Sequence, residues 1–116
     1  MLEKKRIIIT GAGSGIGRAT SKLAAAYGAQ VVCVDLTDGV EGTVAQITQA
    51  GGTAIAVKAD VSEETSVINF VERCVNEYGG IDGIYANAGV SGGGKSVTEL
   101  TVEDWQRTLG VNTIGV

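Results

Sequence analysis

The chain has 116 residues, enough for one domain with a single hydrophobic core. Its net charge of −4 argues against a nucleic-acid-binding or anionic-membrane surface, and the absence of histidine excludes a histidine-based triad or a histidine-ligated metal site within it. No apolar run approaches the length of a membrane span, and residues 1–6 lack the apolar core of a signal peptide.

The first element is a buried strand that leads through a glycine turn into a helix. The apolar run Ile7–Thr10 predicts the strand, and an amphipathic helix is expected from Gly15 to Tyr27. Between them the glycine spacing is Gly11-x-x-x-Gly15-x-Gly17 and not G-x-G-x-x-G. Glycines let the backbone turn tightly and approach a pyrophosphate, and the N–H groups of the first helical turn point at the anion. The stretch therefore predicts a phosphate-binding loop.

Strands and helices alternate along the rest of the chain. Apolar runs predict three more strands, at Val31–Val34, Ala54–Val57 and Ile81–Ala86. Asp38 and Ser62 are predicted to cap the helices that precede and follow the third strand, and the Thr101-x-x-Asp104 box begins the last helix. The first helix is expected to bury its apolar side chains, Ile16, Ala19, Leu23, Ala24 and Tyr27.

These elements predict the fold class. Because the strands are apolar without alternation, both faces of the sheet must be covered, which indicates a parallel sheet. Right-handed crossovers and the glycine loop after the first strand predict a doubly wound, Rossmann-type α/β fold with strand order 3-2-1-4. Residues 1–116 then form a single, incomplete dinucleotide-binding domain. Cys33 and Cys74 fall in apolar segments, so we expect buried free thiols, no metal site and a cytoplasmic protein.

Asp35 stands at the end of the second strand, twenty positions after Gly15. In a doubly wound fold that position lies beside the adenosine ribose, where a carboxylate accepts from the 2′-OH and repels a 2′-phosphate. The alternative is a strand-end aspartate that starts a turn with Thr37 and Asp38. The glycine loop at this spacing favours the ribose role and predicts NAD as the cofactor.

Together these motifs resemble the short-chain dehydrogenase/reductase family. Thr10 precedes the family's glycine spacing, and Asn87-Ala88-Gly89 matches the element after its fourth strand. Asp60-Val61 resembles the family's adenine-contacting pair, with a turn before Ser62 as the alternative role of Asp60. Leu109–Asn112 resembles the helix segment with the family's catalytic Asn. The resemblance implies NAD(H) contacts at Thr10, Gly11, Gly13, Ser14, Gly15, Ile16, Gly17, Asp35, Leu36, Asp60, Val61, Asn87, Ala88, Gly89 and Val111. It implies that Asn112 bends its helix and organises a water near the family's catalytic lysine.

The resemblance also implies a choice of cofactor. Relatives that take NADP often carry a basic residue at the positions that Ser14 and Leu36 occupy here, so NAD is favoured. Arg18 is nearby, but one turn into the helix, and its alternative role is a solvated helix residue.

The family's proton-transfer set is absent from these residues. It needs a Ser and a Tyr-x-x-x-Lys pair, whereas the fourth residues after the three tyrosines are Val31, Asp82 and Gly89. The chain ends four residues after Asn112, so it is expected to be the catalytically incomplete first half of an oxidoreductase, whose small-molecule substrate needs the missing half. The alternative is a non-catalytic nucleotide-binding or self-assembling fragment.

A second glycine segment satisfies G-x-x-x-x-G-K-[ST] at Gly89–Ser96, which would make the chain an NTP-binding protein that uses Lys95. Such a loop needs a helix that begins at Lys95, but β-branched residues follow it and the capping signal comes only at Thr101. A flexible loop over the mouth of the active site is therefore the favoured interpretation.

The last expectation is a homo-oligomer. Ile81–Ala86 becomes an edge strand without Lys or Pro to protect it, and Trp105 and Leu109 share one side of the last helix. A two-fold dimer that uses Thr101–Val116, the fourth strand, or both would cover these surfaces.

Overall fold

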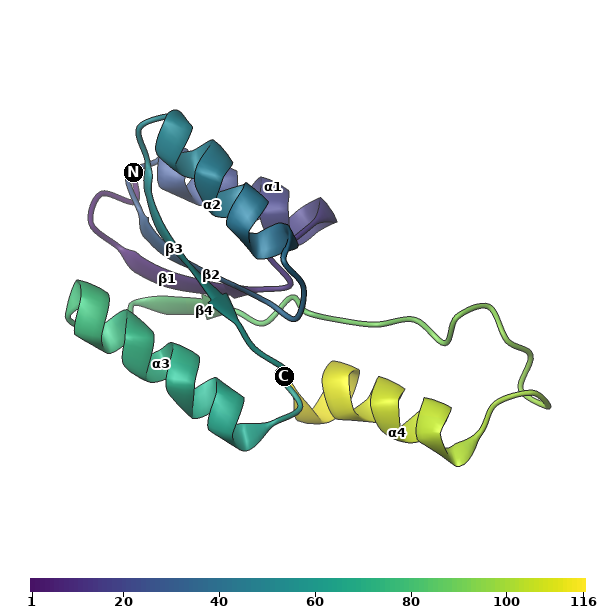
Figure 1. The fold of residues 1–116 in the computed structure, drawn as a ribbon. Helices are drawn as coiled ribbons and strands as arrows, with labels where there is room; N and C mark the ends of the chain where they lie inside the picture. Colours follow the sequence, from purple (N-terminus) through teal and green to yellow (C-terminus); the bar gives the residue numbers. More distant parts are fainter.

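The computed structural model describes all 116 residues, and its centre is a single parallel sheet (Figure 1). The strands are β1 (Arg6–Thr10), β2 (Gln30–Asp35), β3 (Thr53–Lys58) and β4 (Gly83–Tyr85). They lie side by side in the order β3-β2-β1-β4, and every pair of neighbours is parallel. The predicted doubly wound α/β fold and its strand order are confirmed.

Helices cover both faces of the sheet. Figure 1 shows α1 (Gly15–Ala26) and α2 (Gly39–Gln49) on one face and α3 (Glu64–Tyr78) on the other. The chain then leaves β4 in a long connection and returns as α4 (Val102–Leu109), which continues into a π-helical turn, η1 (Gly110–Ile114). None of the helices is both long and apolar enough to cross a membrane.

The two central strands bury side chains on both faces, which explains their unbroken apolar runs. Ile9, Val31 and Cys33 pack in a core under α1 and α2, whereas Ile8 and Val32 belong to a second core under α3. Cys74 lies in this second core, so the two cysteines are buried free thiols in separate cores, as expected. Burial raises the pKa of the Cys33 thiol to about 11, which keeps it protonated and unreactive.

The predicted buried face of α1 is wrong. Four of the five expected side chains are exposed, and only Ala24 is buried. The face that meets the sheet consists of small residues, Gly17, Ser21, Ala24 and Ala25. The helix lies so close to the glycine turn that a Cβ on Gly17 would come within 2.0 Å of the Gly11 carbonyl oxygen. No large side chain fits in that space, so Ile16 and Leu23 are left 70% and 57% exposed.

Two of the predicted side-chain caps are not formed, because each polar side chain has another partner; Asp38 does stand at the N-cap position of α2, whereas Ser62 does not stand at that of α3. Asp38 forms an ion pair with Lys58 at 2.8 Å and makes no cap hydrogen bond. The Ser62 hydroxyl donates to Asp60, and α3 begins two residues later than Ser62, at Glu64. The capping box of Thr101 and Asp104 is present as predicted.

The fourth strand is shorter than predicted and is fixed at its start by an ion pair. β4 contains three residues, whereas six were expected. Just before it, Asp82 accepts hydrogen bonds from Arg6 Nε at 2.9 Å, Arg6 Nη2 at 3.1 Å and the Arg6 backbone N–H at 2.8 Å. This bidentate pairing holds the pKa of Asp82 well below its usual range.

Asp82→Asn should destabilise the folded chain at neutral pH and matter less in acid. The folded-state pKa of Asp82 is lowered, so its contribution to stability is present above the ordinary carboxyl pKa of 3.8 and is lost as the pH falls below that value. Urea unfolding at about pH 7 and about pH 3 measures the difference between the variant and the unmutated chain. The control is Glu72→Gln, an exposed carboxylate outside the ion pairs. A difference that stays constant with pH contradicts the assignment.

Gly17→Ala should destabilise the fold by about 3 kcal/mol, because its Cβ collides with rigid backbone. Gly42→Ala is the matched control: it lies inside α2, and its nearest neighbour would be Arg18 Nη2 at 3.7 Å, an ordinary contact. That change should stabilise the chain by roughly 0.5–1 kcal/mol, as alanine does in place of glycine in a helix. Urea unfolding measures both, and equal effects would contradict the close approach of α1.

Candidate functional site

A hollow of about 500 Å³ lies at the carboxyl ends of β1, β2 and β4, the edge where doubly wound sheets bind ligands. It is lined by Gly11, Ser14, Gly15, Ile16, Val34, Asp35, Leu36, Thr37, Ala59, Asp60, Val61, Asn87, Ala88, Gly89, Val90, Arg107 and Val111. All but three of the residues predicted to contact the cofactor are in this set. The three exceptions, Thr10, Gly13 and Gly17, are buried and do not line it.

Thr10 joins the end of β1 to the segment after β4. Its hydroxyl oxygen accepts from the backbone N–H groups of Asn87 at 3.1 Å and Ala88 at 3.0 Å. In return, Asn87 Nδ2 donates to the Thr10 carbonyl at 3.2 Å. Gly11 has φ +68°, and a Cβ there would come within 2.9 Å of the Ala88 Cα. The glycine is therefore needed both for the left-handed turn and for the close approach of the two segments.

Asp35 is held by the glycine loop as well as by its own turn. The Gly13 N–H donates to Asp35 Oδ2 at 2.9 Å, and a Cβ on Gly13 would lie 2.7 Å from Asp35 Cγ. Oδ1 accepts from the Thr37 N–H and hydroxyl, both at 2.9 Å. The turn that was the alternative role is thus present with Thr37 but without Asp38. A carboxylate has about four lone-pair sites, so Oδ2 keeps acceptor capacity at the wall of the hollow.

Arg18 is not a solvated helix residue, contrary to the alternative considered from the sequence. Its guanidinium donates to the Gly13 carbonyl at 2.5 Å, the Gly39 carbonyl at 3.0 Å and the Thr43 hydroxyl at 2.9 Å. The side chain therefore joins α1, the glycine loop and the start of α2. It does not line the hollow.

Asp60 and Val61 follow β3 and lie in the wall of the hollow. Asp60 Oδ1 accepts from the Ser62 N–H at 2.9 Å and from the Ser62 hydroxyl at 2.6 Å. This turn fixes the Asp60 side chain, and one carboxylate oxygen takes both bonds. Ser62, which the sequence suggested as a helix cap, instead orients a residue of the site.

Asn112 does not line the hollow but ties the last helix to its rim. It lies in η1, where the helix changes from α to π geometry after Leu109. Asn112 Oδ1 accepts from the Val90 N–H, and Asn112 Nδ2 donates to the Val90 carbonyl, both at 2.8 Å. This two-point contact fixes the backbone just after Gly89, beside the hollow.

The Gly89–Ser96 segment lacks the geometry of a phosphate loop. No helix begins at Lys95; α4 begins only at Val102. Lys95 Nζ instead forms an ion pair with Asp104 Oδ2 at 2.9 Å. The hydrogen bond from the Thr101 N–H, together with this ion pair, lowers the pKa of Asp104 to about 2. Lys95 is thus used to join the loop to the first turn of α4, and NTP binding through it is not supported.

Arg107 and Val90 line the hollow although the sequence did not point to them. Arg107 is an exposed residue of α4, and nothing in its local pattern separates it from other exposed helix residues. Its position depends on the path of the long connection that returns α4 to the sheet edge (Figure 1). Predicting that Val90 lines the hollow would have required knowledge of its contact with Asn112.

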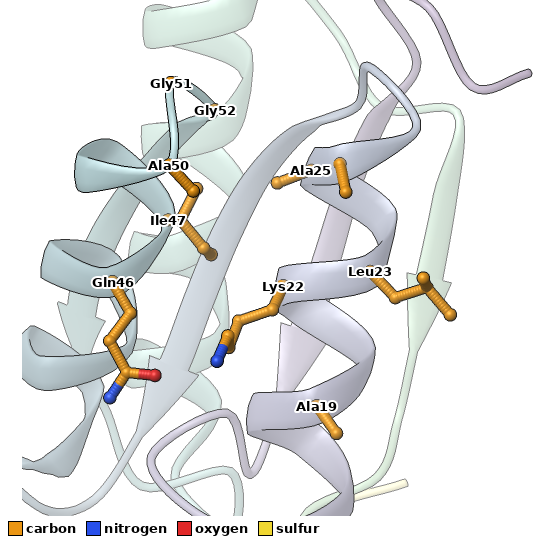
Figure 2. A pocket seen from close by; sticks show the side chains of 10 residues that line it. Ala19, Lys22, Leu23, Ala25, Gln46, Ile47, Ala50, Gly51 and Gly52 are labelled. Atoms are coloured by element: carbon orange, nitrogen blue, oxygen red, sulfur yellow. The ribbon is translucent and has the colours of Figure 1, made fainter.

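A second hollow, of about 540 Å³, lies between α1 and α2 (Figure 2). Its lining is mostly aliphatic, with Ile47 pointing from α2 toward α1, and Lys22 is the only charged residue in it. It brings together no group of titratable or nucleophilic side chains. The chemistry of the chain is therefore concentrated in the first hollow.

Comparison with known proteins gives the chain a family. The family model described as short chain dehydrogenase matches residues 5–116. The chain is 38% identical to the cis-4-hydroxycyclohexanecarboxylate dehydrogenase of Sinomonas cyclohexanicum, over 94% of this chain and 44% of that protein. It therefore spans less than half the length of this curated relative.

Solved structures agree. A short chain dehydrogenase/reductase from Burkholderia phymatum in complex with NAD matches with a TM-score of 0.94 and 33% identity, over 98% of this chain and 41% of its own. A 3-ketoacyl-(acyl-carrier-protein) reductase from Brucella melitensis complexed with NADH matches with a TM-score of 0.92 and 38% identity, over 100% of this chain and 47% of that protein. The chain belongs to the short-chain dehydrogenase family.

Proposed function

We propose that residues 1–116, as one dinucleotide-binding domain, form the NAD(H)-binding part of an oxidoreductase of this family. The observation that carries the proposal is Asp35: its carboxylate is anchored to the glycine loop and still offers an acceptor to the hollow. Two relatives of known structure hold NAD and NADH. The two free thiols fit a reducing compartment such as the cytoplasm.

The residues of the hollow fit a dinucleotide. The glycine turn and the N–H groups at the start of α1 would hold the pyrophosphate, in a space that extra Cβ atoms would fill. Asp35 would accept from the adenosine ribose, and Asp60 and Val61 would contact the adenine. Leu36, Val111 and residues 87–89 would line the remaining length. When bound, the nicotinamide supplies the hydride donor or acceptor of the reaction.

Charge favours NAD over NADP in this proposal. Asp35 is negative, whereas Ser14 and Leu36, which line the same hollow, carry no charge that could pair with a 2′-phosphate. The nearby cations have other partners: Arg18 bonds to backbone carbonyls, and Lys58 pairs with Asp38 at 2.8 Å. Arg107 also lines the hollow, but it lies on α4 and not at the end of β2 or in the glycine loop. A 2′-phosphate at the end of β2 would therefore meet the Asp35 carboxylate without a cation from the loop or from the strand ends to pair with it.

Catalysis needs groups that these 116 residues do not contain. No tyrosine is followed four residues later by lysine, so the family's proton-transfer pair is not present. Asn112 is the one member of the family's catalytic set that we place, and we assign it a positioning role through Val90. The substrate would be bound by residues outside this chain.

The exposed surfaces favour a homodimer. The edge strand β4 leaves Ile84 and Tyr85 exposed, and it carries no Lys or Pro. No residue of α4 is buried, and Trp105 and Leu109 are 51% and 49% exposed. A two-fold contact through α4, β4 or both would remove this apolar area from water.

The unmutated chain should bind NADH more tightly than NADPH, and Asp35→Ala should narrow the ratio of the two dissociation constants by roughly tenfold, about 1.4 kcal/mol. The physical reason is the loss of the ribose acceptor together with the charge that repels the 2′-phosphate. Calorimetric titration measures both constants.

Glu72→Ala is the control, because it removes an exposed carboxylate on α3 that belongs to no ion pair and does not line the hollow. It should leave the ratio close to that of the unmutated chain. Equal affinity of the unmutated chain for the two cofactors contradicts the proposal, as does a Glu72→Ala effect as large as that of Asp35→Ala.

Trp105→Glu should shift the chain from dimer to monomer, since a charge in an apolar contact is costly to bury. Light scattering over a range of protein concentrations gives the mass. Leu23→Glu is the control, an equivalent change at a 57% exposed position on α1. A monomeric unmutated chain at high concentration, or an equal shift in the control, contradicts the assigned contact.

A further inference from the structure

The guanidinium of Arg18 is the centre of a brace behind the glycine loop. Nη2 donates to the carbonyls of Gly13 and Gly39, and Nε donates to the Thr43 hydroxyl. Thr43 is fully buried, and its hydroxyl donates onward to the Ala12 carbonyl at 2.7 Å. The loop is thus bonded at two successive carbonyls to side chains of α1 and α2.

The brace acts on the same residue that holds Asp35. The Gly13 N–H donates to Asp35 Oδ2, while the Gly13 carbonyl accepts from Arg18. Gly39 completes the contact, because a Cβ there would come within 2.6 Å of the Gly13 oxygen. The orientation of Gly13, and with it the position of the Asp35 carboxylate, therefore depends on a bond from a side chain that does not line the hollow.

This geometry also defines what Arg18 does not do. Its Nη2 and Nε donors are directed to three acceptors on α2 and the loop, and the side chain is not part of the wall of the hollow. A guanidinium bound in this way holds backbone atoms in place, since its donors form a fixed planar fork. A cation that recognised a 2′-phosphate would instead point its donors into the hollow.

We propose that Arg18 is a positioning residue that sets the preference for NAD over NADP, by holding Gly13 in the orientation that anchors Asp35. The inference rests on the proposed function of the hollow. Without Arg18, the Gly13 carbonyl loses its donor, and the Thr43 hydroxyl, which holds the carbonyl of the Ala12–Gly13 peptide, loses its anchor. The N–H of that peptide then leaves Asp35, and the carboxylate is no longer fixed beside the ribose. The alternative, that Arg18 is itself a ligand of the phosphate, predicts the opposite change in selectivity.

The first test needs no cofactor. Arg18→Met keeps the apolar stem and removes the donors, and Lys22→Met makes the same charge change one turn further along α1. Hydrogen exchange followed by nuclear magnetic resonance reports the protection of the Gly13 amide, which donates to Asp35. Arg18→Met should speed its exchange about tenfold or more relative to the unmutated chain, and Lys22→Met should not. Unchanged Gly13 protection in Arg18→Met overturns the inference.

The second test is a double-mutant cycle on the NADPH-to-NADH ratio of dissociation constants. Arg18→Met should lower this ratio about threefold to tenfold in the unmutated background and change it less than about twofold when Asp35 is already alanine. A general loosening of the fold would weaken the binding of NADH and NADPH equally in both backgrounds and leave the ratio unchanged. An unchanged ratio therefore contradicts the proposal. Selective loss of NADPH in the Asp35→Ala background also overturns it, because Arg18 would then contact the phosphate.

Thr43→Val provides a second variant if Arg18→Met does not fold. It removes the hydroxyl that accepts from Arg18 Nε, with nearly unchanged volume, and should move Gly13 exchange and the cofactor ratio in the same direction. Failure of Thr43→Val to move either quantity counts against the brace. If the unmutated chain binds neither dinucleotide, the proposed function fails, whereas the Gly13 exchange still decides whether the brace exists.

Discussion

The hydrogen bond from the Gly13 N–H to the Asp35 carboxylate is the contact on which the site depends. It joins the turn after β1 to the end of β2, two places that the parallel sheet brings to the same edge. It exists only because residue 13 has no Cβ, since one there would lie 2.7 Å from Asp35 Cγ. The same rule governs Gly11 against Ala88 and Gly17 against Gly11. Each segment around the hollow is positioned by a backbone approach that a larger residue would prevent.

Two side chains extend this arrangement to the remaining elements. Thr10 connects the loop to the segment after β4, and Asn112 connects that segment to η1. Each of these two side chains makes its connection through two hydrogen bonds. The hollow is thus built from the carboxyl ends of the strands and closed by α4 and η1, which have few other contacts with the sheet. The extended shape, 49 × 25 × 22 Å, follows from that helix and its connection standing away from the core (Figure 1).

The parts predicted correctly from the sequence are those that short-range pattern controls. Unbroken apolar runs predicted the strands, and the Thr101–Asp104 box predicted the start of α4. The errors arise where distant partners compete. Asp38 is taken by Lys58 and Ser62 by Asp60, so neither caps a helix. The face of α1 was misjudged because close backbone packing selects small residues, and hydrophobicity alone does not reveal that.

The candidate site follows the same division. The loop and the strand-end residues were found because their spacing reflects the fold, whereas Arg107 reaches the hollow through the tertiary path of α4. Binding of NAD in the first hollow can be tested with amide nuclear magnetic resonance spectra of the isotope-labelled chain, recorded during a titration with NAD. We expect chemical-shift changes concentrated at residues 10–17, 35–37, 60–61 and 87–90. Shifts confined to the hollow between α1 and α2, or an Mg-ATP response at residues 89–96 with none to NAD, would contradict it.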